Sequence, residues 1–133
     1  MSTAPEIVIT SQDLERIRQL IGTSDSPVAE RLDRELARAK VVPPADVPRD
    51  VVTMNSDVTF EDLSTGVRRT VRVVYPGDAD AEQGKVSILA PMGSALLGLA
   101  VGQTIEWPTP GGVRRVRVVE VLYQPERAGD FHL

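Results

Sequence analysis

The chain has 133 residues, a formal net charge of −4, 41% hydrophobic and 26% charged residues, and no cysteine. This composition is typical of a soluble globular protein, and the absence of cysteine excludes disulfides, thiol nucleophiles and thiolate metal sites. An acidic chain lacks the basic excess of free nucleic-acid binders, and no apolar run approaches the roughly 20 residues of a membrane helix. We therefore expect a cytoplasmic protein with no specific binding of free nucleic acid and no membrane span.

Residues 1–45 predict a short N-terminal helical hairpin. Apolar residues recur at helical spacing in two stretches, Gln12–Ile21 and Val28–Lys40. Two helices joined by a short turn are antiparallel neighbours, and each is too short to be stable alone in water. This short coiled coil must therefore pack on the rest of the chain, and the β-prone residues 7–9 can add a strand to the sheet found there.

Local signals mark where the two helices begin and end. Thr10 or Ser11 can cap the first helix, because each hydroxyl can accept an orphan backbone N–H. Gly22 ends that helix. Ser26 followed by Pro27 is typical of the start of the second helix, since proline fits the first helical position.

Residues 46–133 predict a sheet with one short helix. The β-rich stretches are 51–54 continuing into 58–63, then 67–75, 84–89, 103–107 and 113–123. A turn at 64–66 joins two of them, and an apolar helix over 94–99 follows Pro91. The inward-facing alternation fails near Val118 and Val119, which predicts a β-bulge. Mostly antiparallel strands with one short helix make an α+β domain.

Several motifs in this second part resemble the C-terminal domain of the Gre transcript-cleavage factors. They are Val-Ser-Ile-Leu-Ala-Pro-Met-Gly-Ser-Ala-Leu-Leu-Gly at 86–98, Val-Gly at 101–102 and Pro-Gly-Gly at 110–112. The family pattern is I-S-x-x-S-P-x-x-x-A-L-x-G, then V-G-D and P-x-G, from which Ala90 and Gln103 depart. The resemblance implies an FKBP-like domain of antiparallel strands wrapped on a short helix, behind a helical hairpin.

One branch of that family, Rnk, is named for the regulation of nucleoside diphosphate kinase. The stretches similar to this branch are 51–56, 90–99, 123–126 and 129–130. Together with the Gre motifs, the resemblance covers nearly the whole chain.

Gre factors insert a long coiled coil into the secondary channel of RNA polymerase, where two tip carboxylates help to hold a magnesium ion. That chemistry requires length and two converging acidic side chains. Here the helices reach only about 15 and 20 Å, and the tip, around Ser24 and Asp25, offers one carboxylate. We therefore predict a monomeric regulator that binds RNA polymerase and competes with Gre factors without stimulating cleavage. It needs no catalytic residue, metal or other cofactor. Asp25 is either a turn or helix-capping residue or a contact near the channel entrance.

The resemblance places the contact with polymerase at the loop that opens the short helix. This predicts docking through Pro91, Met92, Ser94 and Leu96. Pro91 can equally be a helix-start proline, and both roles can hold at once. The neighbouring glycines, Gly98 and Gly102, favour turns and close packing.

Three other interpretations of the sequence remain possible. Arginines on neighbouring strands form either solvated strand faces or a partner for an acidic surface; they are Arg68, Arg69, Arg72, Arg114, Arg115 and Arg117. Direct binding of nucleoside diphosphate kinase is an alternative function. Prolyl isomerase activity is a weak one, because it needs an aromatic-walled pocket and fold alone licenses no function.

Overall fold

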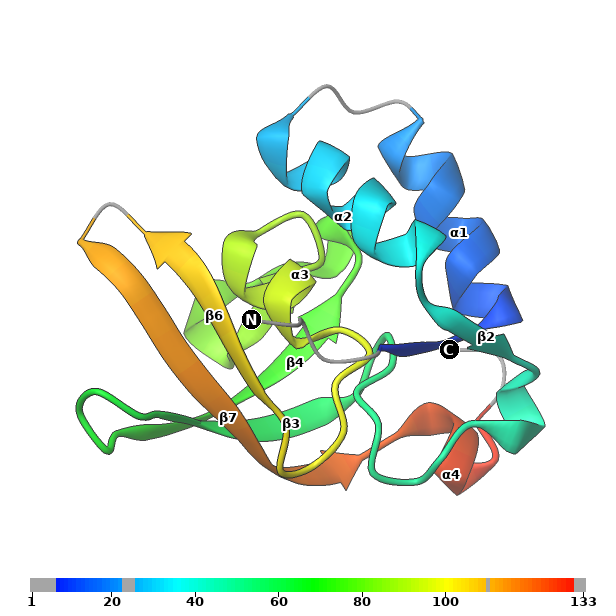
Figure 1. Ribbon diagram of the computed structural model, residues 1–133. Helices are drawn as coiled ribbons and strands as arrows, with labels where there is room; N and C mark the ends of the chain where they lie inside the picture. The colour runs from blue at the N-terminus through cyan, green and yellow to red at the C-terminus, as the bar shows by residue number, and fades with distance from the viewer. Residues whose placement is uncertain (1–6, 23–25, 110, 131–133) are drawn as a thin grey trace.

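The computed structural model describes residues 7–22, 26–109 and 111–130. A helical hairpin lies above a curved five-stranded sheet, and a short helix, α3 (Pro91–Leu96), sits inside the curve (Figure 1). Helices and a mixed sheet make this an α+β fold. None of the helices in the described part of the chain is long and apolar enough to cross a membrane.

The hairpin consists of α1 (Ser11–Ile21) and α2 (Pro27–Ala37). Thr10 Oγ1 caps α1 by accepting the backbone N–H of Asp13 at 3.0 Å, and Ser26 Oγ caps α2 by accepting that of Ala29 at 3.1 Å. Pro27 occupies the first turn of α2. The predicted starts of both helices are confirmed, because a cap is set by side chains within one turn.

The predicted position of the first strand is wrong. Strand β1 (Val8–Thr10) does not extend the five-stranded sheet but pairs in parallel with β2 (Lys40–Val42). The chain leaving α2 supplies this partner, which is also why α2 ends at Ala37 rather than at Lys40. A backbone hydrogen bond from Val8 N to the carbonyl of Gly98, 3.1 Å, still connects β1 to the sheet domain.

The five-stranded sheet has the order β5-β4-β3-β7-β6. Its strands are β3 (Asp57–Asp62), β4 (Arg68–Val74), β5 (Lys85–Ser87), β6 (Thr104–Thr109) and β7 (Gly112–Tyr123). Strands β4 and β5 run parallel, so the sheet is mixed. Residues 51–54 are not part of a bent strand, since Val51 forms only an isolated bridge to Ala100.

The predicted β-bulge is confirmed. Thr59 on β3 faces Glu120 on β7, while the next residue, Phe60, faces Val118, so that Val119 is the extra residue. The bulge returns Val118 and Val121 to the same buried face of the sheet. A second register shift lies nearer the end of β7.

Helix α3 packs closely against the end of β5. A Cβ added at Gly93 would lie 2.2 Å from the carbonyl oxygen of Ser87, so only glycine fits there. Gly98 has φ +82°, and an added Cβ would lie 2.7 Å from the Cβ of Ile7. These contacts confirm the prediction that Gly98 serves a turn and close packing.

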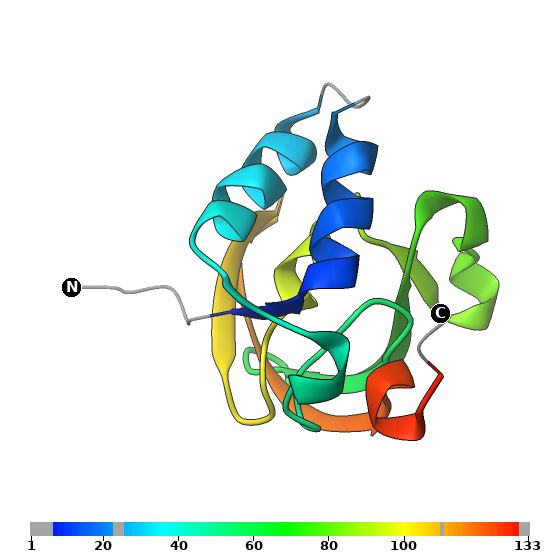
Figure 2. The same ribbon diagram turned by 90° about the vertical axis from the view of Figure 1, so that its right-hand side faces the viewer.

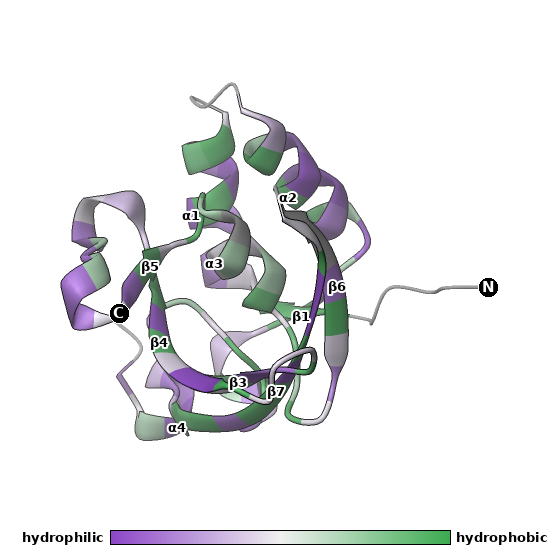
Figure 3. Cartoon of the chain, turned by 90° about the vertical axis from the view of Figure 1, so that its left-hand side faces the viewer, coloured by the Kyte–Doolittle hydropathy of each residue, from purple (hydrophilic) through white to green (hydrophobic). Residues whose placement is uncertain are grey.

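One continuous apolar core links the hairpin to the sheet. Ile17, Leu32 and Leu36 from the hairpin join buried residues of α3 and of the sheet's concave face. The cartoon coloured by hydropathy shows hydrophobic residues along the hairpin helices, α3 and the strands that surround this core (Figure 3). A further helix that the sequence did not predict, α4 (Pro125–Ala128), lies below the loop that follows β2 (Figure 2).

Candidate docking surface and polar joint

The α3 surface, residues 90–94, is the segment on which the sequence placed a partner contact. Pro91 lies in the first turn of α3, and its side chain lies outside the described part of the structure. Met92 is half-buried. Ala90 is the N-cap of α3, and its side chain makes no capping hydrogen bond. The first turn is instead held by Pro91 at the first helical position and by the N–H of Ser94, which donates to the Ala90 carbonyl at 3.0 Å.

Leu96 is not a contact residue, contrary to the prediction. Its side chain is 0% exposed and belongs to the core, so it anchors α3 instead of meeting a partner. Met92, one turn earlier on the same side of the helix, is only partly buried against this core, because it lies nearer the start of α3.

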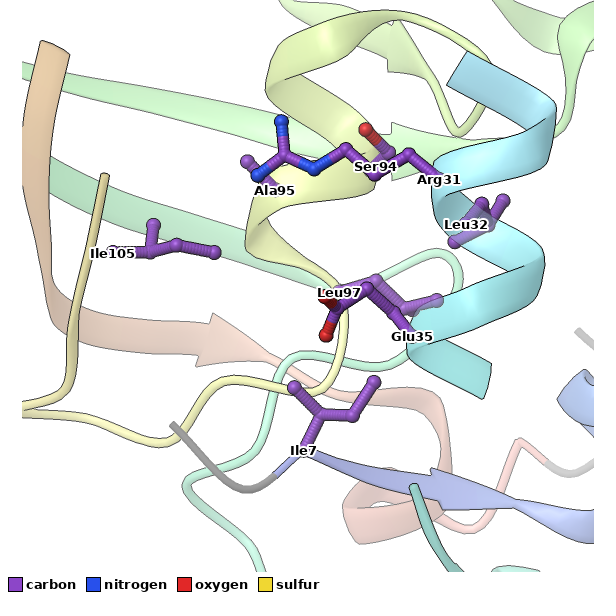
Figure 4. Close-up of a pocket in the computed structure, with 8 residues that line it drawn as sticks. All are labelled: Ile7, Arg31, Leu32, Glu35, Ser94, Ala95, Leu97 and Ile105. Atoms are coloured by element: carbon purple, nitrogen blue, oxygen red, sulfur yellow. The ribbon is translucent and has the colours of Figure 1, made fainter. Parts of the chain in front are cut away.

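Ser94 faces the hairpin. It lines a small pocket between α3, α2 and β6, where Arg31 extends toward it from α2 (Figure 4). The floor of the pocket is apolar, and its volume of about 20 Å³ suits no more than one water molecule. The pocket is therefore too small for a cofactor. Helix α2 partly covers this side of α3.

The hairpin carries the second predicted site, its tip. Ser24 and Asp25 lie outside the described residues. The two helices have eleven residues each, about 16 Å of helix. Across residues 7–22, 26–109 and 111–130, no group of three or more histidine or acidic side chains could hold a metal ion.

A buried polar cluster joins α1 to the sheet domain, and the sequence analysis did not single it out. Asp13 is only 1% exposed, and its Oδ2 accepts a hydrogen bond from the backbone N–H of Met54 at 3.1 Å. Its Oδ1 pairs with the guanidinium of Arg16, one turn further along α1. The carboxylate therefore ties the base of the hairpin to a segment 41 residues away.

Other side chains complete the cluster. The guanidinium of Arg16 lies over the ring of Tyr75, 5.1 Å from its centroid. On the other side of Met54, Thr53 Oγ1 donates to Glu126 Oε1 of α4 at 2.7 Å. We call the five residues Asp13, Arg16, Thr53, Tyr75 and Glu126 the polar joint.

Burial dominates the electrostatics of the polar joint. It raises the pKa of Asp13, against the opposing effects of Arg16 and of the Met54 N–H. It also raises the pKa of Glu126, against the hydrogen bond from Thr53. Burial and the nearby Asp13 charge raise the pKa of Tyr75, whose hydroxyl has no hydrogen-bond partner among the described residues. The Asp13 carboxylate thus has little access to water, whereas Arg16 and Glu126 are partly exposed, so a charge on Asp13 is costly unless its contacts persist.

A sequence signal for Asp13 existed but was incomplete. Thr10 and Asp13 have capping-box spacing, which predicts a polar side chain in the first turn of α1. The spacing carries no information about Met54, so burial of the carboxylate could not be foreseen.

The arginines of the sheet form ion pairs with acids on neighbouring strands, which favours the interpretation of solvated strand faces. These pairs are Arg68–Glu61, Arg72–Asp57, Arg114–Asp62, Arg115–Glu106 and Arg117–Glu61. The acids offset most of the positive charge, so the region is not a basic patch of the kind that binds phosphate backbones.

Two family models match adjacent parts of the chain. "Rnk N-terminus" matches residues 5–42, and "Transcription elongation factor, GreA/GreB, C-term" matches residues 47–123. The first range covers β1, the hairpin and β2, and the second covers the whole five-stranded sheet with α3. Helix α4 lies beyond both ranges.

Individual relatives agree with this division. The regulator of nucleoside diphosphate kinase from Escherichia coli K12 is 45% identical over 133 residues, covering 97% of this chain and 98% of the relative. The structure of a prokaryotic transcription elongation factor GreA/GreB from Nitrosomonas europaea is 53% identical with a TM-score of 0.76, covering 90% of this chain and 99% of that one. The transcription elongation factor GreA of Syntrophobacter fumaroxidans is 34% identical over 90 residues, covering 68% of this chain and 58% of the longer relative. The chain therefore belongs to the Rnk family, whose C-terminal domain is of the GreA/GreB type.

Proposed function

We propose that this protein is a regulator that binds RNA polymerase at the rim of the secondary channel and competes there with Gre factors without stimulating transcript cleavage. One observation carries the proposal: a complete GreA/GreB-type domain bears a hairpin whose helices have only eleven residues each. Docking requires the domain, whereas delivery of a metal to a distant active centre requires a long hairpin with converging acids. A role at polymerase also implies a cytoplasmic location.

The same proposal includes the finer features of the fold. Residues 1–45 act as a short coiled-coil unit, and residues 46–133 act as an FKBP-like docking domain. The wrapping of the sheet around α3 supports the second assignment (Figure 1). The contact with polymerase is made by the α3 surface, through Pro91, Met92 and the half-buried Ser94.

We propose that the protein has no catalytic activity of its own. A prolyl isomerase needs aromatic side chains that converge on one pocket. Phe60 is buried in the core, Tyr75 lies in the polar joint, and Tyr123 donates from its hydroxyl to Asp130. These described aromatic side chains lie in three separate places, which supports a binding role.

Co-sedimentation with core RNA polymerase at low salt tests the proposal. Met92→Glu places a charge on the α3 surface and is expected to weaken binding at least tenfold, about 1.4 kcal/mol. Leu122→Glu is the matched control, because Leu122 is 49% exposed on β7 and is not part of the α3 surface. Absence of binding by the wild type, or an equal loss of affinity in both variants, would contradict the proposal. Cleavage of RNA 3′ ends in stalled complexes, stimulated by this protein, would also contradict it.

A second candidate function follows from the name of the Escherichia coli relative, a regulator of nucleoside diphosphate kinase. We propose that any effect on this kinase is indirect, through transcription. Adding the purified protein to purified kinase is expected to leave the phosphotransfer rate unchanged. A change in that rate, together with capture of the kinase by the protein, would favour direct regulation instead.

A further inference from the structure

The hairpin is connected to the sheet domain by contacts of two kinds. Hydrophobic residues of both helices join the common core, and such contacts are non-directional. Hydrogen bonds that also connect the two parts include Val8 N to the Gly98 carbonyl, and Met54 N to Asp13. Hydrogen bonds depend on angle as well as distance, and those to a charged group are the stronger ones. The polar contacts therefore constrain the direction of the hairpin in addition to the apolar packing.

Helix α4 supports one of these polar contacts from below. Glu126 accepts from the hydroxyl of Thr53, and the backbone N–H of Thr53 donates to Ser56 Oγ at 3.0 Å. Thr53 directly precedes Met54, whose N–H reaches Asp13. A continuous path of hydrogen bonds and one peptide unit thus runs from α4 to α1.

Helix α4 is itself firmly attached. Gln124 is 1% exposed, and its Nε2 donates to the carbonyl oxygens of Pro48 and Val51, both at 2.8 Å. Arg127 donates to the carbonyl oxygens of Arg49 and Val121. This segment lies beyond the range matched by the GreA/GreB model, residues 47–123, so the hairpin is supported by residues outside the part of the chain that matches that model.

We infer that the polar joint is a positioning device in which α4, through Glu126, Thr53 and Met54, holds Asp13 and so sets the direction of the hairpin over α3. When the joint opens, the hairpin swings as a unit. The charged and titratable groups that face the joint are Asp13 and Arg16 of α1, Tyr75 after β4, and Glu126 of α4. Asp13 is buried, so loss of its contact with Arg16 or with the Met54 N–H leaves its carboxylate poorly compensated.

The position of the hairpin would control access to α3. Helix α2 shares the pocket with Ser94, Ala95 and Leu97, so a swing of the hairpin changes how much of this side of α3 a partner can reach (Figure 4). This consequence rests on the proposed function, whereas the positioning role does not.

Distance measurements by pulsed electron paramagnetic resonance test the inference on the free protein. The chain has no cysteine, so spin labels can be attached to Arg34→Cys on α2 and Glu120→Cys on β7, both exposed. The wild-type joint is expected to give one narrow distance distribution. Glu126→Ala is expected to add a second population, while Glu126→Gln, which keeps an acceptor oxygen for Thr53, stays narrow.

A core variant separates positioning from general loss of stability. Val73 is 0% exposed in the sheet, so Val73→Ala lowers stability without touching the joint and is expected to keep the narrow distribution. Asp13→Ala is expected to behave like Glu126→Ala; should it fail to fold, the half-buried Glu126 still decides the question. A narrow distribution in Glu126→Ala, or equal broadening in Val73→Ala, overturns the inference. Polymerase is absent from these measurements, so failure of the proposed function would leave them unchanged.

Discussion

The polar joint and the sheet's ion pairs use the same chemistry, arginine with carboxylate, in opposite surroundings. In the joint, Asp13 is 1% exposed and pairs with Arg16 beneath the hairpin. On the sheet, Arg115 and Glu106 form their pair with side chains 59% and 51% exposed. Water screens the second pair, so it adds little to stability. Removal of a partner from the first leaves a charge where water cannot easily reach. The contrast teaches that the buried pair can fix how the hairpin lies on the sheet domain, whereas the exposed pairs mainly keep the surface of the sheet polar.

The largest effect is expected from breaking the joint. Asp13→Ala removes the partner of Arg16 and leaves the buried N–H of Met54 without its acceptor. We expect the free energy of unfolding to fall by about 3 kcal/mol or more, measured by urea denaturation. The control is Asp57→Ala, which removes a partly exposed acid from its pair with Arg72. Similar losses in the two variants would contradict the contrast.

A smaller effect is expected from the cap beside the joint. Thr10→Ala removes the hydroxyl that accepts the N–H of Asp13, at a cost of about 1 kcal/mol. Thr10→Ser keeps the hydroxyl and is expected to recover most of this loss. Thermal unfolding of both variants and of the wild type measures the two differences. Equal stability of the two variants would mean that the hydroxyl contributes nothing.

The pH dependence of stability is expected to have opposite signs at two aspartates. Because burial raises the folded-state pKa of Asp13, the pH-dependent part of its contribution to stability is fully present below the unfolded value near 3.8 and is lost as pH rises through the raised pKa. Asp62 accepts hydrogen bonds from the Ser64 N–H and from Arg114, which lower its pKa. Its contribution is present above the unfolded value and is lost as pH falls through the lowered pKa.

Urea denaturation across the acidic range, with each aspartate replaced by asparagine, measures these two contributions. Relative to Asp13→Asn, the wild type should lose stability as pH rises. Relative to Asp62→Asn, it should gain stability over the same range. The same sign in both comparisons would show that the surroundings of the two carboxylates do not differ as described.

The smallest effect is expected on the sheet. Arg115→Ala removes an exposed pair with Glu106 and should change the free energy of unfolding by at most about 0.5 kcal/mol. Added salt should reduce even this difference, because salt screens exposed charges. A loss as large as that of Asp13→Ala would place the sheet pairs among the structural determinants of the fold.

Much of the fold could be predicted because the signals were local. Ser26 with Pro27 begins α2, and Val119 forms the bulge that the failed alternation indicated. The partner of β1 could not be predicted from local signals. It is β2, which the path of the chain after α2 brings alongside β1. Met92 is half-buried and its role in docking stays a prediction, whereas Leu96 lies fully in the core, since its orientation depends on which face of α3 the sheet covers.

The sequence by itself determined the family, the α+β class and the starts of the hairpin helices, because motifs, periodicity and caps act within a few residues along the chain. Tertiary structure alone decided that Asp13 is buried against Met54, that α4 reaches the hairpin through Thr53, and that α2 covers one side of α3. Those contacts join residues far apart in the chain, and the free energy of a charged side chain depends on how much water the surrounding segments exclude.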